Sequence, residues 1–259
     1  MTKFSLKNKV AIVTGGGSGI GKAISTTFAG QGGKIHILDF NMDGAKATVA
    51  EINETGATAV AHKCDVSDQK SVNEIINAIA KEEKIDILIN NAGIAHVGNI
   101  DAVEEEDLDR LYNVNIKGVY NCIKAALPSL KSKGGGSILN IASIASTVGI
   151  DDRFAYSMTK GAVLTMTYSI AKDYIKDGIR CNCIAPGRVH TPFVDGFISK
   201  NYPGKEEEMF EKLSKTQPIG RMGSTQEIAD LSLFLSSDEA GFITGSNYAI
   251  DGGFVTLNG

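Results

Sequence analysis

The sequence has 259 residues, of which 42% are hydrophobic and 22% charged, and its 26 Lys and Arg are outnumbered by 30 Asp and Glu. This composition excludes a disordered chain, and the slight acidity argues against nucleic acid or an anionic membrane as the main partner. No run approaches the roughly 18 apolar residues of a membrane span. The first ten residues lack the apolar stretch of a signal peptide, so we expect a cytosolic protein.

Short apolar runs alternate with longer helical patterns along the chain. In chain order, the expected elements are strand 10–13, helix 20–29, strand 34–39, helix 42–55, strand 58–66, helix 69–83, strand 85–90, helix 104–130, strand 137–141, helix 153–177, strand 179–185, helix 225–235 and strand 248–251. Strands that are apolar throughout and separated by helices predict a parallel sheet covered on both faces. We therefore expect a single-domain, doubly wound α/β fold of the Rossmann type over residues 1–259, with about seven parallel strands.

The segment from His190 to Gly223 interrupts this alternation. It has no strand pattern, and it carries Pro192, Pro203 and Pro218 among mixed charges. Long insertions of this kind in compact domains are usually functional. We expect residues 190–223 to form a lid over the substrate.

Neither the cysteines nor the histidines have the spacing of a metal site. Cys181 and Cys183 are too close together for a zinc knuckle, and the four histidines are scattered. The sequence therefore predicts no metal centre, and we interpret Cys181 and Cys183, whose sulfurs share one face of a strand, as buried apolar thiols.

A glycine-rich loop, residues 14–21, follows the first strand and opens the first helix. Gly15 permits a tight turn, Gly19 lets the backbone approach a pyrophosphate, and Gly21 allows the helix to pack closely on the strand. Free N–H groups at the start of the helix favour an anion there. The order of strand, glycines and helix indicates a dinucleotide site rather than a flexible linker. No Gly-Lys-Ser/Thr sequence follows, which excludes a P-loop for nucleoside triphosphates.

Asp39 ends the second strand, 18 residues after Gly21. A carboxylate in this position accepts hydrogen bonds from the ribose hydroxyls of NAD and repels the 2′-phosphate of NADP. Phe40 follows it, and no basic residue precedes Lys22 in the glycine loop. We therefore expect NAD as the cofactor, and we expect NADP to be disfavoured because of Asp39. The alternative, that Asp39 is merely a turn residue, fits this context less well.

Further motifs follow the glycine loop in a fixed order. They are Cys64-Asp65-Val66, Asn90-Asn91-Ala92-Gly93, Asn115, Ser143, Tyr156-x3-Lys160, Pro186-Gly187 and Asp251-Gly252-Gly253. With these motifs the sequence resembles the classical short-chain dehydrogenases/reductases over essentially its whole length. The resemblance implies an oxidoreductase that acts on CH–OH groups. It also implies the residues that bind the cofactor, namely Gly15, Ser18, Gly19, Ile20, Gly21, Asp39, Asp65, Val66, Asn91, Ala92, Gly93, Tyr156, Lys160, Pro186, Gly187, Val189 and Thr191.

Tyr156 and Lys160 are four residues apart and share one face of the helix expected at 153–177. Oxidation of an alcohol needs a base for the hydroxyl proton, and the pKa of a free tyrosine, about 10, is too high for that task near neutral pH. An ammonium beside the phenol lowers this pKa, so we expect Tyr156 to be the general acid/base, assisted by Lys160. Ser143 is expected to orient the substrate oxygen. The resemblance adds Asn115 as the anchor of a water in a proton relay to Lys160.

Arg153 lies three residues before Tyr156, and an arginine there could pair bidentately with a substrate carboxylate. The alternative is a surface arginine paired with Asp151 or Asp152. This region and residues 179–187 resemble a subgroup that acts on hydroxy acids and includes 3-hydroxybutyrate and 2-keto-3-deoxy-L-fuconate dehydrogenases. We therefore expect a small polar hydroxy acid or sugar acid as substrate. The expected substrate-binding residues are Ser143, Arg153 and Tyr156, whereas Arg188 is expected to be solvated.

Other functions stay open at this point. The same scaffold serves reductases of 3-oxoacyl thioesters and dehydrogenases of neutral sugars. A non-catalytic dinucleotide-binding sensor is a remote alternative, because such a protein would be free to lose Tyr156.

The resemblance also implies a homotetramer. One interface is expected on the helices around 104–130 and 154–177, and the other on residues 252–259, whose apolar Phe254, Val255 and Leu257 fit a buried tail.

Overall fold

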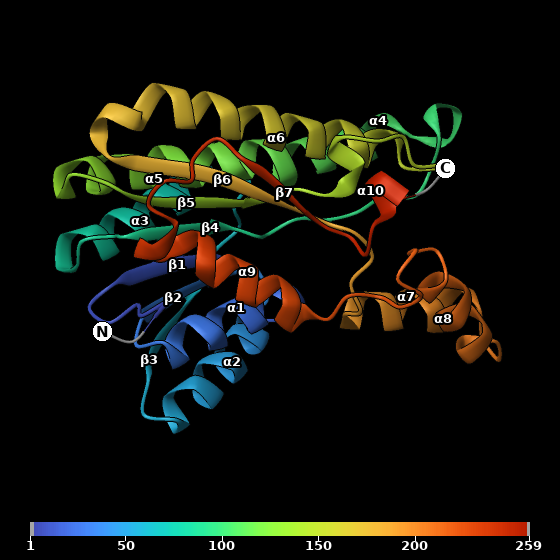
Figure 1. Cartoon of the computed structure of the whole chain (residues 1–259), viewed down its shortest axis with the longest axis horizontal. Coiled ribbons are helices and arrows are strands. Elements are labelled where there is room, and N and C mark those ends of the chain that lie inside the picture. Colours follow the sequence, from blue (N-terminus) through green and yellow to red (C-terminus); the bar gives the residue numbers. More distant parts are fainter. Residues whose placement is uncertain (1–2, 258–259) are drawn as a thin grey trace.

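Seven parallel strands form one twisted sheet in the computed structural model, which describes residues 3–257 (Figure 1). Their order across the sheet is β3-β2-β1-β4-β5-β6-β7, and every neighbouring pair is parallel. The strands are β1 Val10–Thr14, β2 Lys34–Asp39, β3 Thr58–Lys63, β4 Ile87–Asn90, β5 Gly136–Ile141, β6 Ile179–Pro186 and β7 Asn247–Ile250. The doubly wound Rossmann-type sheet predicted from the sequence is confirmed.

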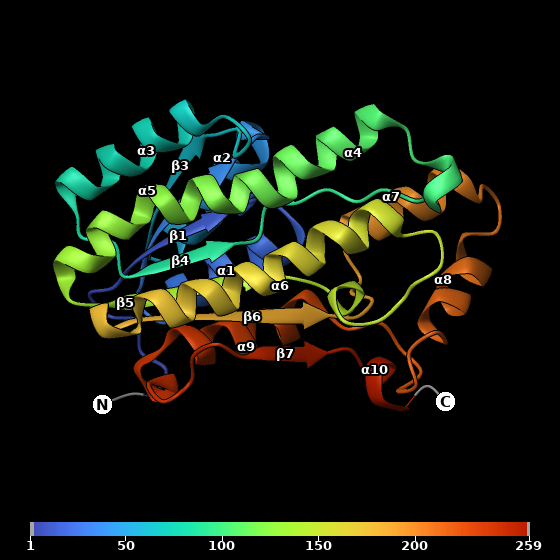
Figure 2. The ribbon, with the colours of Figure 1, turned by 90° about the horizontal axis from the view of Figure 1, so that it is seen from above.

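Helices cover both faces of the sheet. The longer ones are α1 Gly19–Gly30, α2 Met42–Glu54, α3 Gln69–Glu82, α5 Gly118–Lys133, α6 Phe154–Tyr174 and α9 Thr225–Ser236. Helices α1, α2 and α9 lie on one face, and α3, α5 and α6 lie on the other (Figures 1 and 2). The shorter helices are α4 Glu105–Leu111, α7 Pro192–Asn201, α8 Glu206–Ser214 and α10 Phe254–Leu257. No helix among residues 3–257 combines the length and apolar character needed to cross a membrane.

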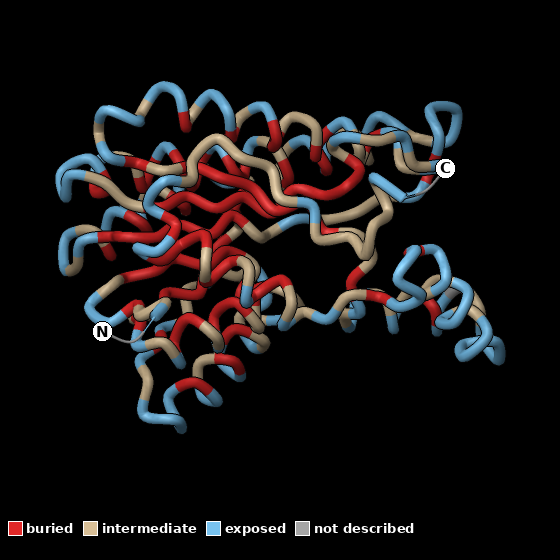
Figure 3. Tube along the Cα trace, in the orientation of Figure 1, coloured by how far each residue is buried: buried red, intermediate tan, exposed pale blue. Residues whose placement is uncertain are grey.

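Each face of the sheet builds its own hydrophobic core. Ile12 belongs to the core under α3, α5 and α6, whereas its neighbours Ala11 and Val13 belong to the core under α1, α2 and α9. This alternation follows from the two-residue repeat of a strand. All five residues of β1 are buried because both faces are covered, and Figure 3 shows the same for the central strands.

The helix expected at 104–130 is interrupted. Helix α4 ends at Leu111, a π-helical turn spans Tyr112–Lys117, and α5 continues to Lys133. Gly134 then ends the helix with a φ of 83°, a left-handed conformation suited to glycine. Such π turns insert extra backbone into a helix and often occur at functional sites. Here the turn contains Asn115.

Other element boundaries differ by a few residues. Strand β3 ends at Lys63 rather than at Val66, because the chain turns away where the Asp65 carboxylate accepts hydrogen bonds from both the N–H and the hydroxyl of Ser67. Helix α6 ends at Tyr174 and is followed by a 3-10 turn over Ile175–Asp177. These corrections leave the topology unchanged.

The segment 190–223 contains the two helices α7 and α8. Its ends are joined by backbone hydrogen bonds, from Gly223 N to Arg188 O and from His190 N to Gly223 O, both 2.9 Å long. In Figure 2, β6 and β7 point toward α7, α8 and α10. The segment therefore lies beyond the carboxyl ends of these strands.

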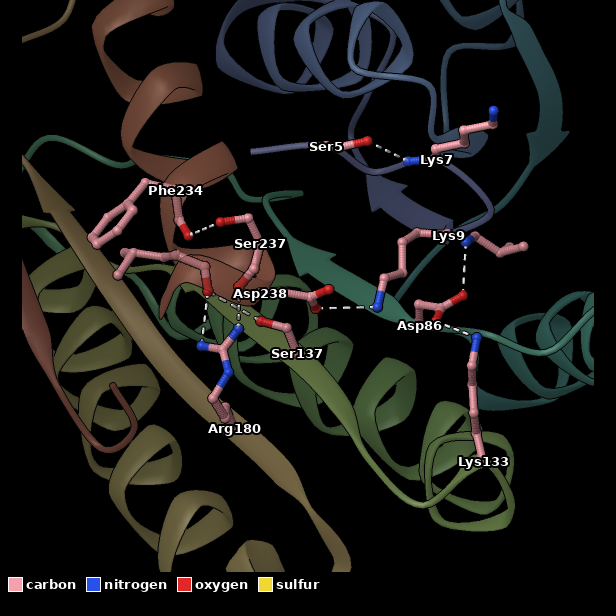
Figure 4. Close-up of polar contacts among 12 residues, drawn as sticks. Ser5, Lys7, Lys9, Asp86, Lys133, Ser137, Arg180, Phe234, Ser237 and Asp238 are labelled. Carbon is pink, nitrogen blue, oxygen red and sulfur yellow. Dashed lines mark hydrogen bonds and ion pairs between the residues drawn. The ribbon is translucent and has the colours of Figure 1, made fainter. Parts of the chain in front are cut away.

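Polar contacts hold the strands together at their amino ends (Figure 4). The Asp86 carboxylate accepts a 2.9 Å hydrogen bond from Val10 N and a further one from Lys133 Nζ. Arg180 donates to the carbonyl oxygens of Leu235 at 2.8 Å and Ser237 at 3.2 Å. Because these groups are satisfied by the protein itself, this edge is built for stability.

Candidate active site and dinucleotide cradle

The predicted site residues gather at the carboxyl ends of the strands. The loops after β1, β4, β5 and β6 carry the glycine loop, the Asn91–Gly93 segment, Ser143 and the Pro186–Thr191 segment. The strand order reverses between β1 and β4. Ligands of doubly wound folds bind outside the carboxyl ends of the strands at such a switch point.

The glycine loop needs glycine for two different reasons. Gly15 and Gly19 have φ values of 64° and 52°, which L side chains rarely adopt. At Gly21 a Cβ atom would lie 2.1 Å from the carbonyl oxygen of Gly15, so the start of α1 could not pack on the loop. Ser18 is the N-cap of α1, yet its side chain makes no capping hydrogen bond. The N–H groups of this helix end are thus left for an anion.

The loop after β6 reaches the start of α1. A Cβ built at Gly19 would lie 3.6 Å from Cγ2 of Thr191, the residue that caps α7. Val189 is buried, and Gly187 packs so closely that a Cβ would lie 2.5 Å from Oε1 of Gln217. Thr191 and the glycine loop therefore flank one space, as a pyrophosphate site requires.

Asp39 ends β2 with its carboxylate beside the glycine loop. Its Oδ2 accepts a 2.8 Å hydrogen bond from Gly17 N, and its Oδ1 accepts one of 2.8 Å from Asn41 N. A carboxylate offers about four lone-pair sites, so hydroxyl donors can still bind. The position and chemistry of Asp39 fit the ribose end of a dinucleotide.

Thr14 shapes the wall formed by the Asn91–Gly93 segment. Its Oγ1 accepts 3.0 Å hydrogen bonds from the N–H groups of Asn91 and Ala92. The Asn91 amide in turn donates to the carbonyl oxygens of Thr14 and Gly15 at 3.0 and 3.1 Å. Thr14 begins the glycine-loop motif in the sequence, but no role was predicted for it. Its place at the end of a buried strand, directly before Gly15, was the available signal.

Val66, which follows β3, is buried and contacts helix α5. Asn121 Nδ2 donates a 2.8 Å hydrogen bond to Val66 O, and a Cβ at Gly118 would lie 2.7 Å from Val66 Cγ2. Asp65 is fixed by Ser67. Both residues follow the carboxyl end of β3 and are among those that the resemblance implies bind the cofactor.

Ser143, Tyr156 and Lys160 come together between β5 and α6. Ser143 follows β5, and its hydroxyl accepts a 3.2 Å hydrogen bond from Ala145 N. Lys160 lies one turn beyond Tyr156 on α6, with Nζ 5.8 Å from the centre of the Tyr156 ring. Lys160 Nζ donates a 2.7 Å hydrogen bond to Ile141 O. The predicted catalytic side chains are therefore brought to one place by a strand end and one helix face.

Burial dominates the protonation of this group. Burial raises the pKa of Tyr156, and a hydrogen bond with Ser143 and the nearby positive charge of Arg153 oppose that rise. Burial also lowers the pKa of Lys160 to about 8. The sequence analysis expected Lys160 to act on the phenol. In the structure its ammonium is bonded to the main chain, and Ser143 and Arg153 are the groups that favour the phenolate.

Asn115 binds the backbone of the segment after β4. Its Oδ1 accepts from Ile94 N and its Nδ2 donates to Ile94 O, both at 2.9 Å, and Nδ2 also lies 3.1 Å from Thr159 Oγ1. A Cβ at Gly93 would lie 3.3 Å from Asn115 Oδ1 and 3.6 Å from Lys160 Nζ. Gly93 therefore leaves open the approach to both side chains.

Arg153 lies near Tyr156, and Arg188 lies near Arg153. Arg153 Nη1 donates to the carbonyl oxygen of Asp152 at 2.9 Å, and Arg188 Nε donates to Thr216 Oγ1 at 3.3 Å. Burial and the positive charge of Arg153 both lower the pKa of Arg188, which is half-buried rather than solvated as predicted. Neither guanidinium forms an ion pair with a carboxylate of residues 3–257, so the suggested pairing of Arg153 with Asp151 or Asp152 is not formed.

The described part of the chain contains no group of three or more His, Cys, Asp or Glu side chains able to hold a metal ion. Its four cysteines are buried and unpaired, and for Cys181 and Cys183 this burial was predicted from the sequence. The residues present instead fit a dinucleotide, because an uncapped helix start, an acidic β2 end and an open Gly93 line one edge of the sheet.

Comparison with known proteins gives the same picture. A family model described as enoyl-(acyl carrier protein) reductase matches residues 15–255. An uncharacterized oxidoreductase of Thermotoga maritima is 39% identical over 252 residues, which cover 96% of this chain and 98% of the relative. The rat (Rattus norvegicus) protein named dehydrogenase/reductase SDR family member 6 is 37% identical over 250 residues, with 96% and 98% covered.

A solved structure agrees over nearly the whole chain. L-sorbose reductase from Gluconobacter frateurii, in complex with NADPH and L-sorbose, superposes with a TM-score of 0.94 at 28% identity, covering 99% of this chain and 100% of that one. The sheet order, the glycine loop and these similarities lead to one conclusion: the chain belongs to the classical short-chain dehydrogenase/reductase family and is an NAD(P)-dependent oxidoreductase.

Proposed function

We propose that the protein transfers a hydride between NAD(H) and the secondary alcohol or ketone of a small polar hydroxy acid or sugar acid. The nicotinamide cofactor, when bound, accepts or supplies the hydride. Every other part of the reaction falls to side chains of this chain, with Tyr156 as the general acid/base.

Arg153, near Tyr156, and its neighbour Arg188 carry the proposal for an acidic substrate. Arg153 is close enough to Tyr156 and to Arg188 for its charge to act on the pKa of each. Two like charges without a carboxylate partner among residues 3–257 are unfavourable unless an anion joins them. A guanidinium binds a carboxylate through two parallel hydrogen bonds, which would also fix the orientation of the substrate.

The proton path starts at the substrate hydroxyl. In the oxidation direction the proton passes to Tyr156 Oη, which Ser143 and Arg153 make more acidic against the effect of burial. Ser143 would hold the substrate oxygen during this transfer. Lys160, with a pKa lowered to about 8, is able to release a proton near neutral pH. Asn115, which holds Ile94 and faces the same space across Gly93, would anchor the relay water.

The choice of NAD over NADP rests on Asp39. Its carboxylate lies beside the glycine loop and is proposed to bind the adenosine ribose, where a negative charge disfavours a 2′-phosphate. The related sorbose reductase was solved with NADPH. Lys63 lies opposite Asp39 in the register of β2 and β3, and a lysine there would favour the 2′-phosphate of NADP. Its ammonium, however, is bonded to the carbonyl oxygen of Phe40. Direct titration with NADH and NADPH separates the two cofactors.

The segment 190–223 is proposed to cover the substrate as part of one domain spanning residues 1–259. Its base lies at Arg188 and Gly223, next to the proposed carboxylate site, and its helices lie beyond the strand ends (Figure 2). Exposed Phe193 on α7 and Ile219 near the end of the segment supply apolar surface that such a cover needs.

A homotetramer is proposed from exposed apolar side chains. Tyr112, Tyr120, Phe154, Met158 and Tyr168 are each more than 40% exposed and lie on or next to α5 and α6. At the other predicted interface, Leu257 is 72% exposed, whereas Asn258 and Gly259 lie outside the described residues. Exposed apolar side chains that gather into a contiguous patch mark protein contacts, and we propose that these side chains form such a patch. Light scattering of the purified protein measures the assembly.

A reductase of neutral sugars is the second candidate. The sorbose reductase was solved with L-sorbose, a neutral sugar. A reductase of thioesters is a separate alternative, which the description of the family model as an enoyl-(acyl carrier protein) reductase supports. These similarities concern the scaffold, whereas the unpaired Arg153 and Arg188 are features of this site.

The test compares a hydroxy acid with its uncharged amide. In the wild type, kcat/KM for the acid should exceed that for the amide at least tenfold. Arg153→Ala and Arg188→Ala should each raise KM for the acid about tenfold or more, because a charged hydrogen bond contributes roughly 1.5–3 kcal/mol, and should change KM for the amide less than twofold. Equal changes for acid and amide would reject the acidic substrate.

A further inference from the structure

His96 ties the segment after β4 to helix α4. Its Nε2 lies 3.2 Å from Asp107 Oδ2 in the first turn of α4, and Asp107 Oδ1 accepts a 2.6 Å hydrogen bond from Arg110. The His96 side chain is 16% exposed, and its Nδ1 is buried without a hydrogen-bond partner among the described residues. The ring is therefore held at one end by Asp107 and enclosed at the other.

The His96 ring also limits where Gly98 can lie. A Cβ at Gly98 would be 3.0 Å from His96 Cε1, closer than nearly all real contacts, and Gly98 itself is buried. The glycine backbone thus packs directly against the imidazole. A movement of the His96 ring would therefore allow Gly98 to shift.

Gly98 in turn holds the backbone on both sides of Arg153. Gly98 N donates a 2.8 Å hydrogen bond to Asp152 O, and Phe154 N donates one of 3.1 Å to Gly98 O. Asp152 has a φ of 53°, which is uncommon for a residue other than glycine and persists where neighbours hold it. These two hydrogen bonds fix the chain direction at Arg153, the residue before α6.

We propose that His96, held by Asp107, is a positioning residue for Arg153 and so for recognition of the substrate carboxylate. The connection runs from Asp107 through the His96 ring to Gly98, and from Gly98 to residues 152–154. It acts through Arg153, whereas Ser143, Tyr156 and Lys160 are held by β5 and α6 instead. The inference rests on the proposed carboxylate site.

The design uses three variants of the full-length protein and one matched control. His96→Ala removes the ring, Asp107→Asn removes the charge that holds it, and His96→Gln keeps a donor able to reach Asp107. Arg110→Gln is the control, because it removes the other partner of Asp107 and leaves His96 in place. For each protein, kcat and KM are measured with a hydroxy acid and with its amide, and the dissociation constant of NADH is measured by fluorescence.

His96→Ala and Asp107→Asn should raise KM for the acid about tenfold, with KM for the amide and NADH binding changed less than twofold. His96→Gln should recover most of the loss, and Arg110→Gln should match the wild type. In an Arg153→Ala background, His96→Ala should add no further effect. A rise of KM that is equal for acid and amide, or effects that multiply in the double variant, would overturn the proposal.

Amide hydrogen exchange tests the same connection without any substrate. The N–H groups of Gly98 and Phe154 should exchange at least tenfold faster in His96→Ala than in the wild type, whereas Lys160, deep in α6, should be unchanged. If exchange accelerates but Arg153→Ala shows no acid selectivity, the proposed substrate is wrong and the positioning role stands. Unchanged exchange at Gly98 and Phe154 would overturn the positioning role itself.

Discussion

The Nζ atom of Lys160 donates a 2.7 Å hydrogen bond to the main-chain carbonyl oxygen of Ile141. Ile141 is the last residue of β5, two residues before Ser143. Lys160 is thereby fastened to the strand that carries Ser143, while Tyr156 projects from the same helix, near enough to Ser143 for that hydroxyl to lower the pKa of Tyr156. Strand β5 and helix α6 thus form one rigid frame for the three side chains, and rigid elements place reacting groups more precisely than loops do.

Replacing Tyr156 by Phe should remove turnover and leave the cofactor site intact. The ring keeps its packing on α6, but no group remains to exchange the proton, so kcat should fall by at least 10²–10⁴. The dissociation constant of NADH should change less than twofold in a fluorescence titration. Substantial residual turnover would defeat the assignment of Tyr156.

Replacing Gly21 by Ala should disrupt the dinucleotide site at the glycine loop, residues 14–21. The new Cβ would meet the Gly15 carbonyl at 2.1 Å, so α1 and the loop must move apart. Forced repacking of this kind costs typically 1–3 kcal/mol, and NADH should bind at least tenfold more weakly. Gly30→Ala is the control, because nothing lies within 4 Å of a Cβ there. Urea unfolding and NADH titration compare the two, and similar behaviour of both variants would contradict the role of Gly21.

The pH dependence of oxidation should respond to Arg153. Burial raises the pKa of Tyr156 and Arg153 lowers it, so removing this cation should raise the pKa further. In Arg153→Ala the rising limb of kcat/KM against pH, measured with a neutral alcohol, should move to higher pH, while Arg153→Lys should resemble the wild type. An unmoved limb in Arg153→Ala would show that the guanidinium does not act on the phenol.

Two histidines at the edge of the sheet should make the fold sensitive to acid. His36 Nδ1 lies 2.9 Å from His62 Nε2, and burial lowers the pKa of both rings, that of His62 to about 4. Glu83 and Lys34 are the charged groups that act on His36. Because the unfolded chain binds these protons near the usual pKa of about 6.5, the stabilisation is present above that pH and is lost as pH falls toward 4.

In His62→Gln the free energy of unfolding should therefore decline less steeply between pH 6.5 and 4. The slope should correspond to the uptake of up to one proton fewer on unfolding than in the wild type. Urea titrations at several pH values give this slope for both proteins. Identical slopes would mean that His62 is not held neutral by the fold.

The fold could be predicted almost completely because its signals are local. The apolar runs at β1 and β4, for example, mark buried parallel strands, and the glycine loop between β1 and α1 marks the edge that binds ligand. The predicted site residues come from separate elements, and their order along the chain was the basis for predicting them.

Features that depend on contacts between distant residues were not predictable. The apolar pattern of a helix continues through Tyr112–Lys117, but the π turn there depends on how Asn115 meets Ile94 and Thr159. The burial of Arg188 depends on the chain around Thr216 and Gln217, about 28 residues further on. The contact between His96 and Asp107 likewise joins a loop to a helix start that the sequence does not pair.

The proposed substrate class and cofactor are tested most directly by following the absorbance of the reduced cofactor at fixed enzyme concentration. The substrates are matched hydroxy acids, their amides, neutral sugars and thioesters, each with either NAD or NADP. We expect the highest kcat/KM for a hydroxy acid with NAD, at least tenfold above its amide and above the same acid with NADP. A neutral sugar or a thioester as the best substrate, or a preference for NADP, would contradict the proposed function.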